Sequence, residues 1–307
     1  MNSWQRWIKA PHTTRFRRIL FQVHLWMGIG LGLYILVISV SGSAVVLRPQ
    51  INRGFIHNEV EAAGREGLTG SRLEAAILDQ YMDYQVLNII PPNREGRAVY
   101  VSLERNGEES GRYFDQYDGA DLGSSYPWQV HTVEWLTLLH DDLLMDRALG
   151  RKLNGFGGMF FLLMVFSGIL IWWQGKRRWK EGLVISGSSR RGLLWQLHSF
   201  LGFWALLFML VWGVTAIYFA FPQPFDALID AMDPDLDDFE RPDGWLLFLI
   251  DLHFGRFRGA WPGLPYLWTI LGLLPAVMFI SGFILWYQRV LKRQRSADSN
   301  PAQKQHL

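Results

Sequence analysis

The sequence contains no cysteine among its 307 residues. Disulfide bonds, thiolate metal sites, iron–sulfur clusters and covalently attached c-type haem are therefore excluded. Charged residues are also missing from four long stretches, at 21–47, 153–174, 192–221 and 259–288. Half of all residues are hydrophobic and 15% are aromatic. This composition is not that of an ordinary soluble enzyme, and it favours a membrane protein.

Each uncharged stretch reaches or exceeds the roughly 20 residues that a helix needs to cross a hydrocarbon core of about 30 Å. A crossing segment must satisfy its own backbone hydrogen bonds, and the alternating pattern of barrel strands is absent. We therefore predict a mainly α membrane protein with four transmembrane helices. The first stretch is too long for a signal-peptide core and is expected to stay as an anchor.

Basic residues cluster at 15–18, 176–191 and 289–295. By the positive-inside rule, both termini and the middle loop are expected to be cytoplasmic. The predicted organisation is a cytoplasmic tail and first helix at 1–47, an external insert at 48–130, an outer-boundary segment and second helix at 131–175, a cytoplasmic loop at 176–192, a third helix at 193–221, an acidic external segment at 222–262, and a fourth helix with a cytoplasmic tail at 263–307.

Two tandem repeat units are predicted from matching segments. Residues 19–28 read ILFQVHLWMG and residues 193–202 read LLWQLHSFLG, which places His24 and His198 at equivalent positions. The second and fourth stretches end in SGILIWW at 167–173 and SGFILWY at 281–287. Each unit then consists of an outgoing helix, an external segment and a returning helix.

A second pair of histidines precedes the returning helices. His140 lies 36 residues before Lys176, and His253 lies 36 residues before Arg289. At about 1.5 Å per residue, an unbroken helix of that length would exceed the bilayer core. We therefore expect the outer pair at the outer membrane boundary, with a helix break near Gly150, Gly155 or Pro262.

Two imidazoles at equal depth on facing helices are what an iron porphyrin needs as axial ligands. The pattern predicts two b-type haem groups, the inner bound by His24 and His198 and the outer by His140 and His253. Glycines at i+4 leave room on the histidine's own face. The residues expected around the inner haem are Gly28, Gly202, Trp26 and Phe200, with Phe21 and Trp195.

Several alternatives remain open at this point. A single histidine in a membrane helix can simply hydrogen-bond to a neighbour, although intramembrane ionisable groups are functional candidates by default. Zinc would require more ligands clustered at one depth. His131 could replace His140 as an outer ligand. The repeat favours a transporter, whereas the lack of broken helices with intramembrane carboxylates argues against one.

The external insert contains a small α+β fold between about Gly67 and Ser125. The S-x-x-E pattern at Ser71 and the apolar spacing after it predict a helix. Two strand-like runs, AVYVSL at 98–103 and RYFDQY at 112–117, are joined across Asn106-Gly107. This insert offers no nucleophile, metal cluster or phosphate loop, so it is expected to serve contact or shielding.

The chain resembles the PepSY-associated transmembrane family of bacterial inner-membrane proteins. The resemblance is carried by the histidines near the start of stretches one and three, LLHDDLLMDRALGRKLNG before the second, LHFGRFRG before the fourth, the SGILIWW and SGFILWY endings, and RYFDQYDGADLG, which looks like the closing strand of a PepSY module. The family includes haem-containing reductases of ferric siderophores. The resemblance implies a multi-pass protein of the bacterial inner (cytoplasmic) membrane with a plausible haem role.

The expected function is transfer of electrons through two haem groups from the cytoplasmic face to a ferric chelate or siderophore outside. No G-x-G-x-x-G follows a predicted strand, so the electron donor is expected to be external, either quinol or a cytoplasmic reductase. The lipid bilayer is the other expected partner, and no nucleic acid is expected. The alternative is a non-enzymatic PepSY-type protein that binds or regulates a partner in iron uptake.

Overall fold

The computed structural model describes residues 3–9, 11, 14–62, 64–68, 70–175, 179–185, 190–232, 241–257 and 259–298. Part of the predicted cytoplasmic loop and the middle of the predicted acidic segment lie outside these ranges. The chain divides into two compact units. One, called the membrane unit here, comprises the residues up to Val46 and those from Leu136 onward; the other, called the insert, is Leu47–Trp135.

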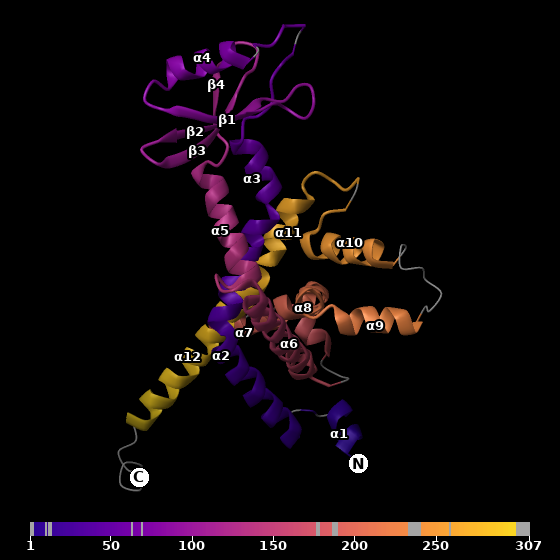
Figure 1. Ribbon diagram of the computed structural model, residues 1–307. Coiled ribbons are helices and arrows are strands. Elements are labelled where there is room, and N and C mark those ends of the chain that lie inside the picture. The colour runs from indigo at the N-terminus through magenta and orange to yellow at the C-terminus, as the bar shows by residue number, and fades with distance from the viewer. Residues whose placement is uncertain are drawn as a thin grey trace. The chain divides into compact units, whose positions relative to one another are not determined.

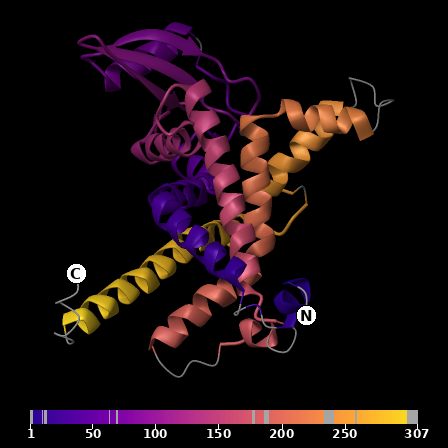
Figure 2. The same cartoon turned by 90° about the horizontal axis from the view of Figure 1, so that it is seen from below.

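The described part of the membrane unit is helical (Figure 1). Its elements are α1 (Ser3–Lys9), α2 (Arg15–Val46), the end of α5 (Trp128–Asp142), α6 (Arg147–Trp172), the 3-10 helix η2 (Trp179–Leu183), α7 (Arg190–Trp204), α8 (Leu206–Ala220), α9 (Gln223–Met232), α10 (Arg241–Phe254), α11 (Leu264–Gly272) and α12 (Leu274–Asp298). α2 packs against α6, α11 and α12, and α6 packs against α8. Figure 2 shows α2 crossing α12.

Three helical segments of the described chain are long and apolar enough to cross a membrane. They are α2, α6 and the segment Leu264–Lys292, which consists of α11 and of α12 as far as Lys292. α7 and α8 make a fourth candidate if the pair forms one span, because the two helices are bent by 60° at their junction. The third predicted helix is therefore broken where the sequence predicted a continuous one.

The outer-boundary helices break at two places. α5 ends at Asp142 and α6 begins at Arg147. Asp146 caps the start of α6, because its carboxylate accepts hydrogen bonds from two backbone N–H groups of the first turn. The break predicted near Gly150 is confirmed, a few residues before that glycine, and Gly155 lies inside α6. A Cβ on Gly155 would lie 2.4 Å from that of Ala220, so this glycine permits close helix packing. The other predicted break, near Pro262, is confirmed between α10 and α11.

The insert is a small antiparallel sheet with a helix packed on it. The strands β1 (Gln85–Ile90), β2 (Val99–Arg105), β3 (Glu108–Phe114) and β4 (Asp121–Ser124) are arranged in sequence order, and α3 (Arg48–Phe55) and α4 (Gly70–Gln80) precede them. Asn106 and Gly107 have φ of 56° and 85°, the left-handed values that a tight hairpin turn requires. The core consists of Leu73, Ile77, Val99, Val101, Leu103 and Phe114. The predicted helix and hairpin are confirmed, and β1 and β4 are additional strands.

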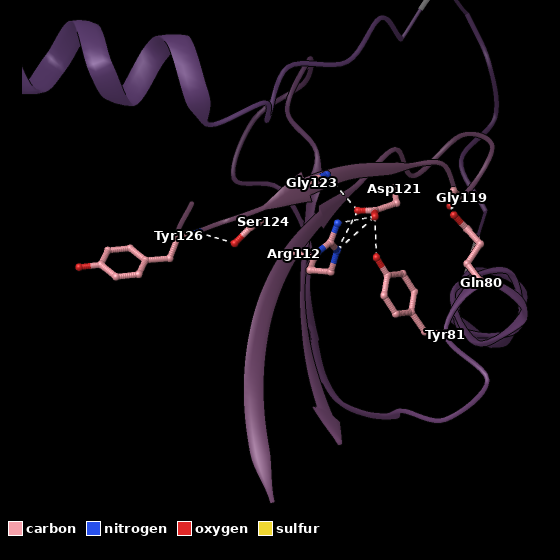
Figure 3. A network of polar contacts seen from close by, with 8 residues as sticks. All are labelled: Gln80, Tyr81, Arg112, Gly119, Asp121, Gly123, Ser124 and Tyr126. Carbon is pink, nitrogen blue, oxygen red and sulfur yellow. Dashed lines mark hydrogen bonds and ion pairs between the residues drawn. The ribbon is translucent and has the colours of Figure 1, made fainter. Parts of the chain in front are cut away.

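A polar network connects α4 to the sheet of the insert (Figure 3). The Asp121 carboxylate accepts hydrogen bonds from Arg112 Nη2 at 2.6 Å, from the Tyr81 hydroxyl at 2.6 Å and from the Gly123 backbone N–H at 2.9 Å. Burial, and then the bond to Asp121, raises the pKa of Tyr81 to about 12. Burial opposes ionisation of Asp121, but these donors keep its pKa below the ordinary value. The network thus stabilises the fold of the insert.

Candidate functional site

Two of the predicted histidines line one cavity of the membrane unit. His24 of α2 and His198 of α7 both face a space of about 210 Å³, called the inner cavity here. Its walls come mainly from α2, α6, α7 and α12, and most of the lining side chains are apolar or aromatic. The structure therefore brings together two imidazoles that are separated by more than 170 residues in the sequence.

A serine and a backbone carbonyl of α6 hold the His24 ring. His24 Nδ1 lies 2.9 Å from Ser167 Oγ and 3.1 Å from the carbonyl oxygen of Met164. Ser167 Oγ donates to the same carbonyl at 2.8 Å. A Cβ on Gly168 would lie 3.2 Å from His24 Cε1. A glycine thus lets the imidazole approach α6 closely.

Residues of α12 contact His198 of α7 in the same arrangement. His198 Nδ1 lies 2.8 Å from Ser281 Oγ, which donates to the Met278 carbonyl at 3.0 Å. A Cβ on Gly282 would lie 3.3 Å from His198 Cε1. Residues 164–168 and 278–282 both read M-x-x-S-G, so each histidine is held by the same five-residue pattern on a neighbouring helix.

The other two histidines form a second pair. The ring centres of His140, on α5, and His253, on α10, are 6.3 Å apart with the planes at 57°. Both line a space of about 120 Å³, called the outer cavity here. Burial lowers the pKa of His140, and it lowers the pKa of His253 to about 3. The two rings are therefore neutral near pH 7, which is the protonation state that metal ligation needs.

Hydroxyl groups also contact the outer histidines. His140 Nδ1 lies 3.0 Å from the Ile38 carbonyl oxygen and 3.4 Å from Ser41 Oγ, both on α2. A Cβ on Gly42 would lie only 2.5 Å from His140 Cε1. His253 Nδ1 lies 2.6 Å from Thr215 Oγ1 of α8.

Side chains from the spans fix the helix ends that carry the outer pair. Asn154 Nδ2 donates to the carbonyl of His140 at 2.6 Å and to that of Asp141 at 2.8 Å. The indole N–H groups of Trp212 and Trp268 both donate to the carbonyl of His253, at 3.1 and 3.0 Å. Carbonyls in the last turn of a helix have no partner within it, so these donors satisfy them and hold the ends of α5 and α10 in place.

The two cavities are neighbours. Ile35, Phe161 and Pro275 line both of them. The inner and outer histidine pairs are therefore separated by a wall of apolar side chains within one helical unit.

The remaining predicted site residues divide into two groups. Gly28 and Gly202 line the inner cavity, as do Phe21 and Trp195. Trp26 and Phe200 do not belong to its wall, and the Trp26 side chain is 60% exposed. The reason is geometric, because a residue at i+2 from a histidine lies on the other side of the helix, whereas residues at i−3 and i+4 share its face.

His131, the alternative outer ligand, lies in the insert, where its ring packs edge-on against Tyr126 with centres 5.6 Å apart. Within the residues that the structure describes, no group of three or more histidine, aspartate or glutamate side chains could hold a metal ion. The four predicted histidines line the two cavities as pairs.

The hydroxyl partners of the histidines were not predicted. Ser41, Ser167 and Ser281 are each followed by glycine, and Thr215 is followed by alanine. This recurrent pair of a hydroxyl residue and a small residue is visible in the sequence, but it was interpreted only as the matching ends of two spans. All the described contacts use Nδ1, which leaves Nε2 of each ring as the nitrogen available to a ligand in the cavity.

A model of the PepSY-associated TM region matches residues 21–245 of the chain. The match includes His24, His140 and His198, and His253 follows shortly after its end. No curated protein matches the chain significantly. Since the match covers well over half of the chain, the protein belongs to the PepSY-associated TM region family.

Proposed function

We propose that this membrane protein binds two b-type haem groups and passes electrons through them to a ferric chelate, such as a siderophore, outside the cytoplasm. The observation that carries the proposal is the pairing of the four histidines in two adjacent cavities. In this proposal His24 and His198 are the ligands of the inner haem, and His140 and His253 are those of the outer haem.

The spacing of the outer pair suits two ligands of one metal ion. A metal–imidazole bond is about 2 Å long. The ring centres of His140 and His253 are 6.3 Å apart, so both rings would reach a metal ion placed between them. The neutral rings and the Nδ1 contacts also suit ligation through Nε2.

The surfaces of the cavities support the same proposal. Cofactor pockets are typically lined mostly by apolar and aromatic groups, with a few polar groups among them. Both cavities have walls of this kind, each with two histidines. Gly28 and Gly202 line the inner cavity without filling it. A Cβ added to Gly28 would lie 3.9 Å from Met164 Sδ, and one added to Gly202 would lie 2.9 Å from Met278 Cε.

The protein's own residues have three roles in this proposal. The histidines provide nitrogen ligands, the apolar walls exclude water, and Ile35, Phe161 and Pro275 keep the two sites adjacent. Bound haem iron supplies reversible one-electron oxidation and reduction. Two tandem units, each with one inner and one outer histidine, explain why the contacts of His24 and His198 correspond residue for residue.

In this proposal electrons move outward from the cytoplasmic face of the bacterial inner membrane, with both termini cytoplasmic. Quinol or a cytoplasmic reductase supplies the electrons, and each ferric iron in a chelate accepts one of them to become ferrous iron. Reduction weakens the match between the iron and hard oxygen ligands, so the metal is released more easily. The acidic segment predicted at 222–262 would repel anionic chelates and favour neutral or cationic ones. Its residues 233–240 lie outside the described residues.

The function is tested with purified protein that has been reduced under anaerobic conditions. Addition of a ferric chelate is expected to reoxidise the protein and to release one ferrous iron, captured by a ferrous-specific dye, per electron lost. The variant His253→Ala is expected to slow this reaction while its inner site is still reduced. A wild-type protein that stays reduced, or that loses electrons without forming ferrous iron, contradicts the proposed function.

A further inference from the structure

We propose that Ser41, Ser167, Thr215 and Ser281 are positioning residues that fix each histidine as the Nδ1–H tautomer and direct Nε2 into its cavity. The inference rests on the proposed haem function and adds to it four residues that do not themselves touch the cofactor. Each acts through the histidine that it contacts.

The tautomer follows from where each hydroxyl proton goes. Every one of the four hydroxyls donates to a backbone carbonyl of its own helix. The bonds are Ser41 to Val37 at 2.7 Å, Ser167 to Met164 at 2.8 Å, Thr215 to Val211 at 2.8 Å and Ser281 to Met278 at 3.0 Å. Because a hydroxyl has only one proton, its oxygen is left as an acceptor toward histidine. Nδ1 must then carry the hydrogen, and Nε2 keeps its lone pair.

For two of the rings, contacts with backbone carbonyls independently indicate the same Nδ1–H tautomer. His24 Nδ1 lies 3.1 Å from the carbonyl oxygen of Met164, and His140 Nδ1 lies 3.0 Å from that of Ile38. A carbonyl oxygen can only accept a hydrogen bond. The nitrogen facing it therefore donates, as the hydroxyl argument requires.

The residue after each hydroxyl is small for a steric reason. An added Cβ on Gly42, Gly168 or Gly282 would lie 2.5, 3.2 or 3.3 Å from Cε1 of the neighbouring histidine. Alanine follows only at Thr215. The hydroxyl and the small residue act together, since one anchors Nδ1 and the other lets the edge of the ring lie against the helix.

Ordinary back-bonding of serine and threonine in helices does not account for this pattern. Thr269 in α11 makes the same type of bond, donating to the Pro265 carbonyl at 2.9 Å, and none of the described hydrogen bonds joins its hydroxyl to a histidine. In contrast, each of the four positioning hydroxyls lies on a different helix from its histidine. The four contacts therefore join separate helices at the proposed ligands, which a local helix effect does not require.

Preorganisation of this kind has two expected consequences for a bound metal. A ring already held in the ligating orientation loses less entropy on binding, and the hydrogen bond from Nδ1–H makes the imidazole a stronger donor. Loss of such a contact typically lowers metal affinity by roughly 10-fold to 100-fold. A weaker donor also raises the reduction potential of the iron.

The test uses the full-length protein with Ser281→Ala and Thr215→Ala, the conservative variants Ser281→Thr and Thr215→Ser, and Thr269→Ala as a matched control. Haem affinity, the midpoint potential of each haem and the electron paramagnetic resonance of the ferric state are measured. We expect Ser281→Ala to weaken the inner haem roughly 10-fold to 100-fold and raise its potential, and Thr215→Ala to do the same to the outer haem.

The conservative variants are expected to restore the wild-type potential and resonance, and Thr269→Ala is expected to change neither. If both alanine variants match Thr269→Ala in affinity, potential and resonance while wild-type protein binds two haem groups, the positioning role is wrong and the proposed function stands. If an alanine variant does not fold, Ser281→Thr or Thr215→Ser is the test instead, and a loss of haem affinity or a shift in potential in a variant that keeps the hydroxyl contradicts the role. Wild-type protein that binds no haem overturns both.

Discussion

His24 and His198 lie within helices that are candidate membrane spans, whereas His140 and His253 lie in the last turns of α5 and α10. The described contacts of the inner rings come from a serine, a glycine and a backbone carbonyl of a facing helix. The ends of the helices that carry the outer rings are held in addition by Asn154, Trp212 and Trp268. The outer pair thus depends on more contacts than the inner pair.

The largest expected effect comes from removal of a ligand. His24→Ala or His198→Ala should lose the inner haem and keep the outer one, and His140→Ala or His253→Ala should do the reverse. The reason is that each cavity contains only its own pair among the four. Haem content per chain, measured after extraction, is expected to fall from about two to about one. Loss of both groups in every variant, or of neither, contradicts the division into two sites.

Alanine substitution of the glycines beside the rings should lower haem affinity more at the outer site than at the inner site. Gly42→Ala places a Cβ 2.5 Å from His140 Cε1, whereas Gly282→Ala places one 3.3 Å from His198 Cε1. The first must displace the ring, and the second needs a shift of a few tenths of an ångström. We expect Gly42→Ala to lower outer-haem affinity at least roughly ten-fold and Gly282→Ala to have a smaller effect on the inner haem. Equal effects in haem titrations argue against the tighter outer packing.

A smaller effect is expected from the contact that holds the end of α5. Asn154→Ala removes two hydrogen bonds to the carbonyls of His140 and Asp141 and leaves both carbonyls without this donor. An unsatisfied buried polar group costs about 1–3 kcal/mol. The outer haem should therefore bind less tightly while the inner haem is unchanged. Equal weakening of both sites in a haem titration indicates a general loss of stability instead.

The smallest effect on haem is expected from the insert. Asp121→Asn removes an ion pair with Arg112. Because the pKa of Asp121 is lowered in the folded state, its stabilising contribution is present above the unfolded pKa of about 3.9 and is lost as the pH falls through the folded value. The variant should lose about 1 kcal/mol or less at pH 7 and show a weaker acid dependence. Hydrogen exchange of β3 and β4 in full-length protein measures this, and haem content should not change.

The sequence predicted the elements whose signals are local and strong. Long uncharged runs predicted the apolar helices, and Asn106-Gly107 predicted the hairpin of the insert. The repeat and the counted distances predicted which histidines share a cavity. These features depend on composition and spacing, and both can be read without knowledge of tertiary contacts.

Other features depend on which helix faces which. Trp26 was expected beside the cofactor, yet the i+2 position turns it away from His24. A helix break was expected near Gly150, and the Asp146 cap places it a few residues earlier. Gly150 itself lies inside α6, where a Cβ would lie 2.0 Å from the Asp142 carbonyl oxygen, and only the packing of α5 against α6 reveals this contact. The hydroxyl partners needed the packing of α2, α6, α8 and α12 around the rings, because nothing in one helix alone identifies its partner.

The central claim is that each cavity binds one haem between two histidines. The most direct test combines the pyridine haemochrome assay with electron paramagnetic resonance on protein purified from haem-replete cells. The account predicts about two b-type haem groups per chain, both low-spin with two histidine ligands. Colourless protein that takes up no added haem, or protein with only high-spin, five-coordinate iron, would contradict it.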